Sequence, residues 1–272
     1  MSSFLTLVRK EIRDAAQSRW LVGFALSFGL LVLLFARVQS GGDVFAEGFN
    51  RTTAGLLNLA LLAVPLLALL LGAAAVATER EQGTLATLLS QPIGAGELLL
   101  AKYAGLTLAL WAAVALGFGL GGLLLALVAP LGALDRYLVF VGLAAGLASA
   151  SASIGVLLSV LLRTRLRAMA AAVLVWLVLT LFYELAAIAV ALTISASGRT
   201  LLLASLLDPV EAARILGILA VEPNLEVLGP LGAYLATELG TGVTAGLLAS
   251  ALVAWVAAPL VVAVAVFRRQ DV

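Results

Sequence analysis

The sequence contains no cysteine and no histidine, and its only methionines are Met1 and Met169. Without cysteine the chain forms no disulfide. Without imidazole or thiolate it has no ligand set for zinc, soft copper or haem, and no Ser-His or Cys-His pair for nucleophilic catalysis. Charged residues are also scarce, at 11%, and the net charge is +1, which gives no basic surface for nucleic acid. We therefore expect neither a bound cofactor nor a nucleic-acid partner.

Long apolar runs dominate the chain. Hydrophobic residues make up 63% of the 272 residues and the mean hydropathy is +1.17, whereas a soluble domain is about half apolar. Runs of about 20 apolar residues predict membrane-spanning helices. Six are found, at residues 20–38, 56–77, 103–128, 137–162, 168–194 and 243–267. The sequence predicts an all-α membrane protein with a single transmembrane domain over residues 1–272.

Basic residues are unevenly shared between the two sides of this arrangement. Eleven of the 16 arginines and lysines lie at the termini and in the loops on one side, and five lie on the other. The positive-inside rule then places both termini in the cytoplasm. It also makes the loop at 78–102 cytoplasmic and the segment at 195–242 external.

The first 19 residues have an amphipathic pattern. At helical spacing Phe4, Leu5, Val8 and Ile12 share one face, and three basic residues lie among them: Arg9, Lys10 and Arg13. This pattern predicts a helix lying in the membrane interface with its basic side toward the headgroups. A charged tail without regular structure is the alternative.

The external segment contains a helix-start pattern. Asp208 stands at the N-cap position, Pro209 at the first helical position and Glu211 at the third. A helix is predicted to continue over 212–220, and a second one over 225–239. Such helices would either cap the spans or bind an external partner, and Arg214 belongs to the first of them.

Several glycines in the spans need an explanation. The stretch GFGLGG at 117–122 matches a dinucleotide-binding fingerprint, but it lies inside an apolar span and not after a strand, so we reject that function. Gly117 with Gly121, and Gly142 with Gly146, form GxxxG pairs that let helices approach closely in lipid. The sequence leaves open whether these pairs pack helices of one chain or form a dimer seam.

Glu184 is the one charge placed well inside a predicted span. A charge at bilayer depth costs about 2.5–3.5 kcal/mol on insertion scales. Glu184 is therefore expected to face the bundle interior or water. Two interpretations remain open: a group on a substrate or proton path, or an internal hydrogen bond to Thr180 or to another helix.

The loop at 78–102 is longer than a simple connection between two spans requires. Its sequence predicts a polar start, a short amphipathic helix over 84–89, a proline stop and an amphipathic return to the membrane. Such a helix would offer its free face to a cytoplasmic protein. The chain has no GxxxxGK[ST] motif, so energy for uphill transport would come from a partner or an ion gradient.

This loop resembles the cytoplasmic loop of ABC-exporter permeases of the second exporter class. In that family an acidic E-x-E, then G-T-L, L-L-S/T-x-P and E-L with a lysine recur in this order. The matching positions are Glu79, Glu81, Gly83, Thr84, Leu85, Leu88, Leu89, Ser90, Pro92, Glu97, Leu98 and Lys102. The chain length, the long external segment and the stretch DPVEAARIL at 208–216 resemble the NosY-like branch of that family. This branch is associated with maturation of multicopper enzymes such as nitrous oxide reductase.

The resemblance implies a set of partners. The chain would be a non-catalytic permease in the cytoplasmic membrane of a bacterium or archaeon, paired with a second copy of itself and surrounded by lipid. An ABC ATPase dimer, which would bind ATP and Mg²⁺, would contact the coupling helix at 84–89 and the N-terminal interfacial helix. A periplasmic β-helix protein would contact the external helices. Because the chain has no cysteine, no histidine and no cluster of methionines, any copper would be bound by these partners.

Other functions fit parts of the sequence. The apolar spans suit an exporter of a hydrophobic compound, a lipid or an antibiotic equally well. A proton-driven secondary transporter would have several intramembrane carboxylates and broken helices, and the predicted spans contain one such carboxylate. An intramembrane enzyme would lack the usual histidine and cysteine.

Overall fold

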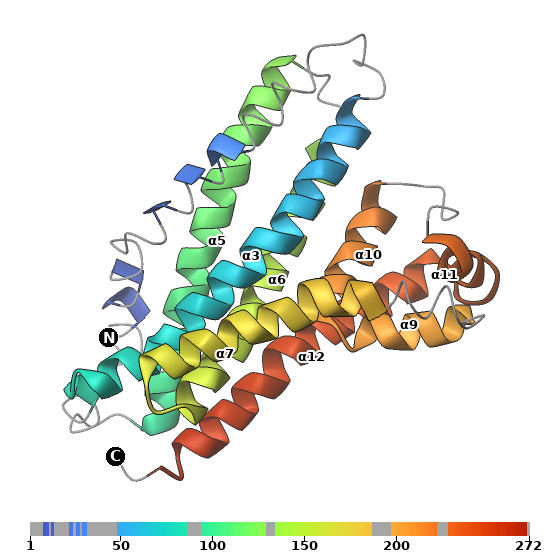
Figure 1. Cartoon of the computed structure of the whole chain (residues 1–272). Helices are drawn as coiled ribbons and strands as arrows, with labels where there is room; N and C mark the ends of the chain where they lie inside the picture. The colour runs from blue at the N-terminus through green and yellow to red at the C-terminus, as the bar shows by residue number, and fades with distance from the viewer. Residues whose placement is uncertain are drawn as a thin grey trace.

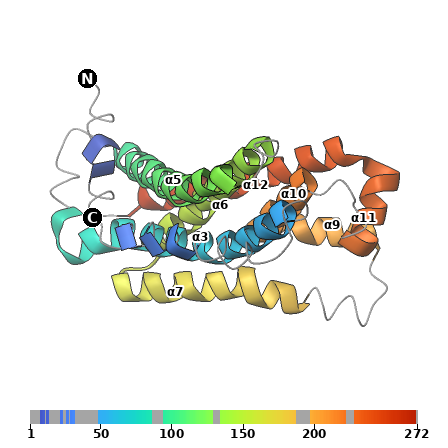
Figure 2. The same cartoon turned by 90° about the horizontal axis from the view of Figure 1, so that it is seen from above.

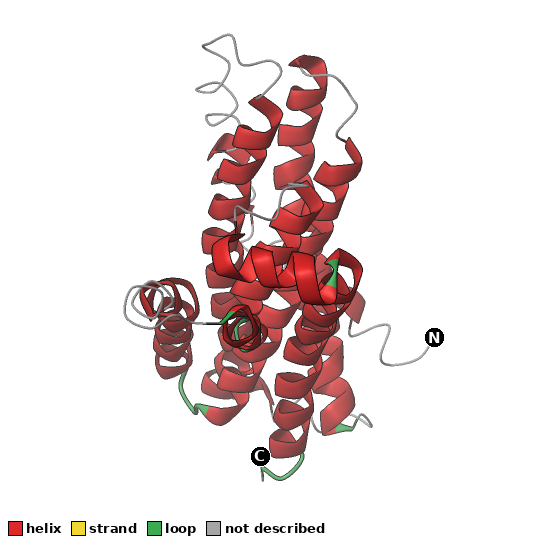
Figure 3. Cartoon of the chain, turned by 90° about the vertical axis from the view of Figure 1, so that its right-hand side faces the viewer, coloured by secondary structure: helices red, strands yellow, loops and turns green. Residues whose placement is uncertain are grey.

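The computed structural model describes residues 8–10, 12–13, 22–23, 26–27, 29–31, 48–85, 94–128, 134–186, 197–221 and 228–270. These residues form helices joined by loops, with no strand among them (Figure 3). The elements are α3 (Gly48–Glu81), α5 (Ala95–Val128), α6 (Leu134–Leu161), α7 (Arg165–Leu177), α9 (Gly198–Leu206), α10 (Pro209–Val221), α11 (Gly229–Tyr234) and α12 (Thr241–Phe267) (Figure 1). Two π-helical turns, η2 (Val178–Phe182) and η4 (Leu235–Leu239), continue α7 and α11.

Five helices are long and apolar enough to cross a membrane. They cover Asn58–Glu81, Ala95–Gly119, Leu138–Leu161, Arg165–Ala186 and Thr241–Phe267. Each of these five helices overlaps one of the six predicted spans. The span predicted at 20–38 falls largely outside the described residues and stays a prediction. The helix α5 begins well before the predicted start at 103, because Glu97 in its first turn favours a helix N-terminus.

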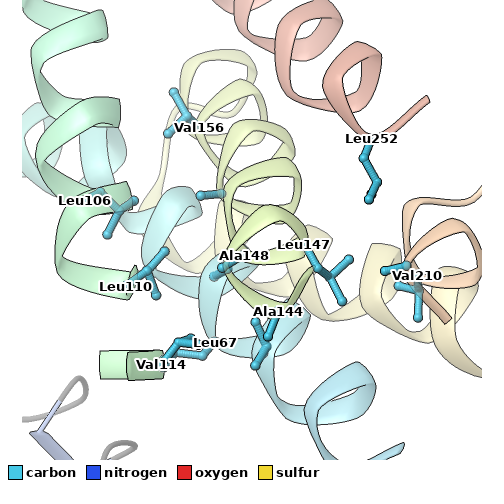
Figure 4. Close-up of a cluster of buried hydrophobic side chains, with 14 of the residues drawn as sticks. Leu67, Leu106, Leu110, Val114, Ala144, Leu147, Ala148, Val156, Val210 and Leu252 are labelled. Atoms are coloured by element: carbon cyan, nitrogen blue, oxygen red, sulfur yellow. The ribbon is translucent and has the colours of Figure 1, made fainter. Parts of the chain in front are cut away.

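The helix α6 lies at the centre of the bundle. It packs against α3, α5, α7, α10 and α12, and the view from above shows the other long helices arranged around it (Figure 2). Apolar side chains from these helices meet along its length. Leu67 of α3, Leu110 of α5, Leu147 of α6 and Leu252 of α12 belong to the same buried cluster (Figure 4).

The closest approach between α3 and α6 is made by two glycines. A Cβ atom on Gly72 would lie 2.6 Å from the Ala152 carbonyl oxygen, and one on Gly155 would lie 2.5 Å from the Leu69 carbonyl oxygen. Both distances are shorter than any real Cβ contact. The backbones of the two helices therefore touch at a point where only glycine fits.

The GxxxG pairs singled out in the sequence do not make this contact. A Cβ atom on Gly142 or on Gly146 would meet nothing within 4 Å in the part of the chain that is described. Gly117 is buried, whereas the side-chain position of Gly121 lies outside the description. For Gly142 and Gly146 the dimer seam is the alternative that remains a prediction.

Polar side chains join α6 to its neighbours. Ser159 Oγ accepts hydrogen bonds from the Val76 and Ala77 amides of α3, each at 2.8 Å. Ser153 Oγ donates to the Val256 carbonyl of α12 at 2.7 Å. Trp111 of α5 donates its indole N–H toward Ser149 Oγ at 2.9 Å. Lipid offers no competing partner for these groups, so the bonds help to fix which helices pair.

Candidate functional site

The ends of five helices meet at one end of the bundle. Here α3, α6 and α12 finish while α5 and α7 begin, and the residues just beyond these ends are rich in arginine. We call this the basic end. Five side chains from the end of α3, the beginning of α5 and the segment after α12 form a polar group there, the basic-end cluster: Glu79, Arg80, Glu81, Lys102 and Gln270.

Glu79 and Lys102 form a buried ion pair within this cluster. Lys102 Nζ lies 2.6 Å from Glu79 Oε1, and the side chains of Lys102 and Glu79 are only 3% and 17% exposed. These two positions open and close the motif found in the sequence. The pair fixes the last turn of α3 to the first turns of α5, from which the loop between these helices departs. Glu79 Oε2 is buried without a hydrogen-bond partner in the described part of the chain.

Arg80 and Glu81 attach the end of α3 to three other helix ends. The Arg80 guanidinium donates to Gln270 Oε1 at 2.6 Å and to the Leu162 carbonyl at 3.4 Å. Gln270 Nε2 in turn donates to the Val160 carbonyl at 3.1 Å. Glu81 Oε1 accepts from the first amide of α7, at 2.8 Å. The positive end of the α7 dipole also stabilises a carboxylate at this position.

The loop that follows the cluster is only partly described. Gly83 ends α3 with a φ of 70°, which favours glycine. Thr84 is exposed and its hydroxyl donates to the Glu79 carbonyl at 3.3 Å. Leu85 is buried and Glu97 is exposed. Leu98 is buried as well. The remaining motif positions, Leu88, Leu89, Ser90 and Pro92, lie outside the described residues, so the helix at 84–89 stays a prediction.

The described N-terminal residues follow the predicted amphipathic pattern. Val8 is buried, and Ile12 packs against the core. Arg9, Lys10 and Arg13 are exposed. The apolar side of this short helical stretch thus faces the bundle. Its place in the membrane interface remains a prediction.

Far from the basic end, α9 and α10 are joined by a turn in which Asp208 is buried and Leu207 is 73% exposed, and α9 runs outward from this turn at the edge of the molecule (Figure 1). The indole of Trp255, near the middle of α12, donates to the Leu206 carbonyl at 3.2 Å, so the hairpin turn lies level with the middle of that span. From there α10 returns alongside α3, α6 and α12 (Figure 1). We call α9 and α10 the re-entrant hairpin. Non-spanning helices at membrane depth are tolerated where protein buries them.

The structure confirms the helix start predicted at Asp208. Asp208 Oδ1 accepts from the amides of Val210 at 2.7 Å and Glu211 at 3.4 Å, and α10 begins at Pro209. The location differs from the simplest expectation for an external helix, however. Asp208 is 1% exposed and Pro209 is buried. A partner protein cannot contact the Asp208 side chain in this conformation, because that side chain is buried.

The helix α9 was missed by sequence reasoning. It begins after Ser197, whose side chain accepts from the Thr200 amide, a cap that the sequence displays. Gly198 packs directly on α11, since a Cβ there would lie 2.1 Å from Tyr234 Cβ. The predicted helix over 225–239 begins at Gly229 instead, where φ is 56°.

Charged residues gather where the hairpin meets the end of the fifth predicted span. Arg214 of α10 forms an ion pair with Glu184, which lies just after η2, and a second one with Glu211 at 3.3 Å. The partner of Glu184 is therefore on another helix. Thr180, the other suggested partner, donates its hydroxyl to the Trp176 carbonyl. One guanidinium is shared by two carboxylates.

Burial changes the protonation of the hairpin carboxylates. Desolvation raises the pKa of Asp208 to about 7, against the lowering effect of the two amide hydrogen bonds. Desolvation also raises the pKa of Glu211, and Arg214 opposes that shift. Near neutral pH Asp208 is therefore partly protonated. A neutral carboxyl explains how a second oxygen, Oδ2, stays buried without a partner among the described residues.

We predict that Asp208→Asn makes stability less dependent on pH. A raised carboxyl pKa favours the folded state fully below the unfolded value of 3.8, and this contribution is lost as pH rises through about 7. The loss between about pH 5 and pH 8 amounts to roughly 2–3 kcal/mol. Asparagine keeps the capping oxygen but does not titrate. Thermal unfolding in detergent at both pH values checks this, and equal slopes for both proteins would contradict it.

Comparison with known proteins identifies the family of this chain. The profile of the family described as "ABC-2 family transporter protein" matches residues 5–272. The chain belongs to the ABC-2 transporter family. It is 31% identical over 283 residues to the probable ABC transporter permease protein NosY of Stutzerimonas stutzeri, covering 99% of each chain. It is also 31% identical over 278 residues to the protein of the same name from Pseudomonas aeruginosa, covering 98% of each. As an ABC-2 permease, the chain is the membrane subunit of an ABC transporter and works with a partner ATPase subunit.

Proposed function

We propose that this ABC-2 permease transmits the movement of an ATPase dimer, bound at the loop between α3 and α5, to the re-entrant hairpin. The basic-end cluster is the observation that carries this proposal. Glu79 and Lys102 fix both sides of that loop, while Arg80 and Glu81 attach the same turn of α3 to α6, α7 and the end of α12. A force on the loop therefore reaches five helices at once.

A contact route from α12 to the hairpin supports the second half of the proposal. Gln270, held by Arg80, directly follows α12. Farther along α12, Val256 accepts from Ser153 of the central helix, and Trp255 bonds to the Leu206 carbonyl at the hairpin turn. If α12 moves along its axis, the hydrogen bond from Trp255 would move the turn between α9 and α10 with it. The basic end would be cytoplasmic, as the arginine distribution predicts.

We further propose that the complex serves maturation of a copper enzyme, such as nitrous oxide reductase, as the likeness to proteins named NosY suggests. The chain has no cysteine or histidine, so it would not hand copper along by ligand exchange. It would act instead as a homodimer that exports a non-metal species or transmits mechanical work. A periplasmic β-helix protein would receive that work at the opposite end.

The test is a crosslinking experiment on the permease purified with its companions. Because the chain has no cysteine, Thr84→Cys introduces a single reactive thiol beside the coupling loop. We expect a stoichiometric ATPase subunit that crosslinks to this thiol. Leu203→Cys on α9, which is also exposed, is the matched control and should give no ATPase crosslink. A permease that purifies alone and gives no crosslink would overturn the proposal, and a co-purified periplasmic β-helix protein would support the NosY-like function.

A further inference from the structure

Besides the apolar packing of α10 on α3, α6 and α12, the re-entrant hairpin makes two polar contacts with spanning helices. On one side, Trp255 of α12 donates a neutral hydrogen bond to the Leu206 carbonyl at the turn. On the other side, the hairpin meets the end of the span that α7 begins, where Arg214 pairs with Glu184. We call this second contact the hairpin ion pair. It is the only ion pair between the hairpin and a spanning helix among the described residues.

The span that carries Glu184 lies at the periphery, where it packs on α3 through Ala168 and Ala172 and through a hydrogen bond from the Trp176 indole to the Leu62 carbonyl. Only 17% of the apolar window of Arg165–Ala186 is buried, against 61% for Leu138–Leu161. The π turn η2 immediately precedes Tyr183 and Glu184. One such turn rotates the residues beyond it by roughly 100° relative to an unbroken α-helix. A peripheral helix with a shifted end is well placed to move relative to the bundle, and the hairpin ion pair opposes that movement.

The ion pair can open without leaving Arg214 unpaired. Arg214 has a second acceptor on its own helix, Glu211 Oε2, at 3.3 Å. The Glu184 side chain is 42% exposed, so the protein does not enclose it once it separates from Arg214. Breaking a fully buried pair would be strongly unfavourable because the remaining charge has no compensation. Here Arg214 keeps an acceptor and Glu184 is not fully buried, so opening costs less than for a fully buried pair.

We propose that Arg214 is a positioning residue of the transport cycle. In one state it holds the re-entrant hairpin against the end of the α7 span through Glu184. In the other state it is paired with Glu211 alone, and the hairpin separates from that span. The cycle itself rests on the function proposed above, because an ATPase drives the change of state.

The proposal predicts opposite effects for the two carboxylates that share Arg214. Glu184→Gln removes the contact between hairpin and span, so it should favour the separated state. Glu211→Gln removes the second acceptor, so it should favour the closed state. A merely structural role would give both substitutions effects of the same sign, namely loss of stability. Arg214→Lys, which keeps a positive charge, should restore much of what Arg214→Met loses.

The measurement is the distance between two spin labels in the permease–ATPase complex. Cysteines replace Leu185 at the end of the α7 span and Leu203 on α9, both exposed positions, in a chain with no native cysteine. Labelled chains are diluted with unlabelled ones so that pairs within one chain dominate. Distances are recorded by double electron–electron resonance without nucleotide and with ATP trapped by vanadate. Arg199→Met, a charge removal at an exposed position of the same hairpin, is the matched control.

Without nucleotide, we expect Glu184→Gln to raise the long-distance population about threefold to fivefold, the effect of losing a partly exposed ion pair. We expect Glu211→Gln to lower the response to trapped ATP, and Arg199→Met to leave both distances unchanged. Shifts of equal sign for the two carboxylate variants, or no shift, would overturn the role of Arg214. If Glu184→Gln acts but ATP has no effect on the wild type, the ion pair is supported and the ATPase-driven function is contradicted instead.

Discussion

Replacing Gly155 with alanine is expected to prevent the two central helices from packing. The new Cβ would lie 2.5 Å from the Leu69 carbonyl oxygen and 3.0 Å from Gly72 Cα, and both contacts are with backbone. No side-chain rotation can relieve them, so α3 and α6 would have to move apart. Overpacking of a core costs about 1–3 kcal/mol when side chains can adjust, and a backbone clash should reach or exceed the upper figure. We expect the midpoint of thermal unfolding in detergent to fall by roughly 10 °C.

The matched control for this substitution is on the same helix. Gly142→Ala adds the same methyl group where nothing lies within 4 Å in the described chain, and alanine favours helix by about 1 kcal/mol over glycine. The control should unfold at the wild-type temperature or slightly above it. Equal midpoints for Gly155→Ala and Gly142→Ala would contradict the close approach of α3 and α6. A drop for Gly142→Ala that appears only in the dimer would instead support the predicted dimer seam.

The second large effect is expected from Lys102→Met. Glu79 would keep its charge while losing the ammonium group 2.6 Å away, and its side chain is only 17% exposed. Removing one partner of a buried pair costs about 3–5 kcal/mol, because the remaining charge is uncompensated. Both the stability in detergent and the amount of ATPase bound to the permease should fall, since the pair fixes the two sides of the coupling loop.

A double substitution separates the effect of an uncompensated Glu79 charge from the effect of losing the contact between Glu79 and Lys102. In the Glu79→Gln, Lys102→Met protein no charge is stranded, so stability should return toward the wild-type value. ATPase binding should recover only if the geometry of the loop is recovered too. The chain's other lysine, Lys10, is exposed, and Lys10→Met should leave stability unchanged. If Lys102→Met and Lys10→Met behave alike, the buried pair is not what holds the loop.

Much of the fold follows from sequence because the bilayer sets the length of a spanning helix. Hydropathy located α3, α5, α6, the α7 span and α12, although it misplaced their polar ends. Hydropathy did not predict that α3 continues through Glu81. That last turn is stabilised by contacts between residues far apart in the chain, such as the hydrogen bond from Arg80 to Gln270. The Asp208 cap was predictable for the opposite reason, since all of its partners lie within three residues.

The re-entrant hairpin shows where sequence reasoning reached its limit. The segments 201–207 and 215–221 are apolar but too short to span a membrane, which is a signal for burial at membrane depth. The pattern did not say which helices would cover them. The pairing of Arg214 with Glu184 likewise joins positions in different elements, and no local rule connects them. The glycines that pack helices, Gly72 and Gly155, were missed because they form no GxxxG pair within one helix.

The contacts of Arg80 also fix an order of events during biosynthesis. Arg80 ends the first of the five described spans, whereas its partner Gln270 follows the last one. Glu81 finds its partner, the Arg165 amide, only when the α7 span begins. In a nascent chain these groups therefore lack some of their protein partners through much of its insertion, and the end of α3 acquires its full set of bonds last. Membrane quality control that recognises exposed polar groups at helix ends would distinguish complete chains from truncated ones at this point.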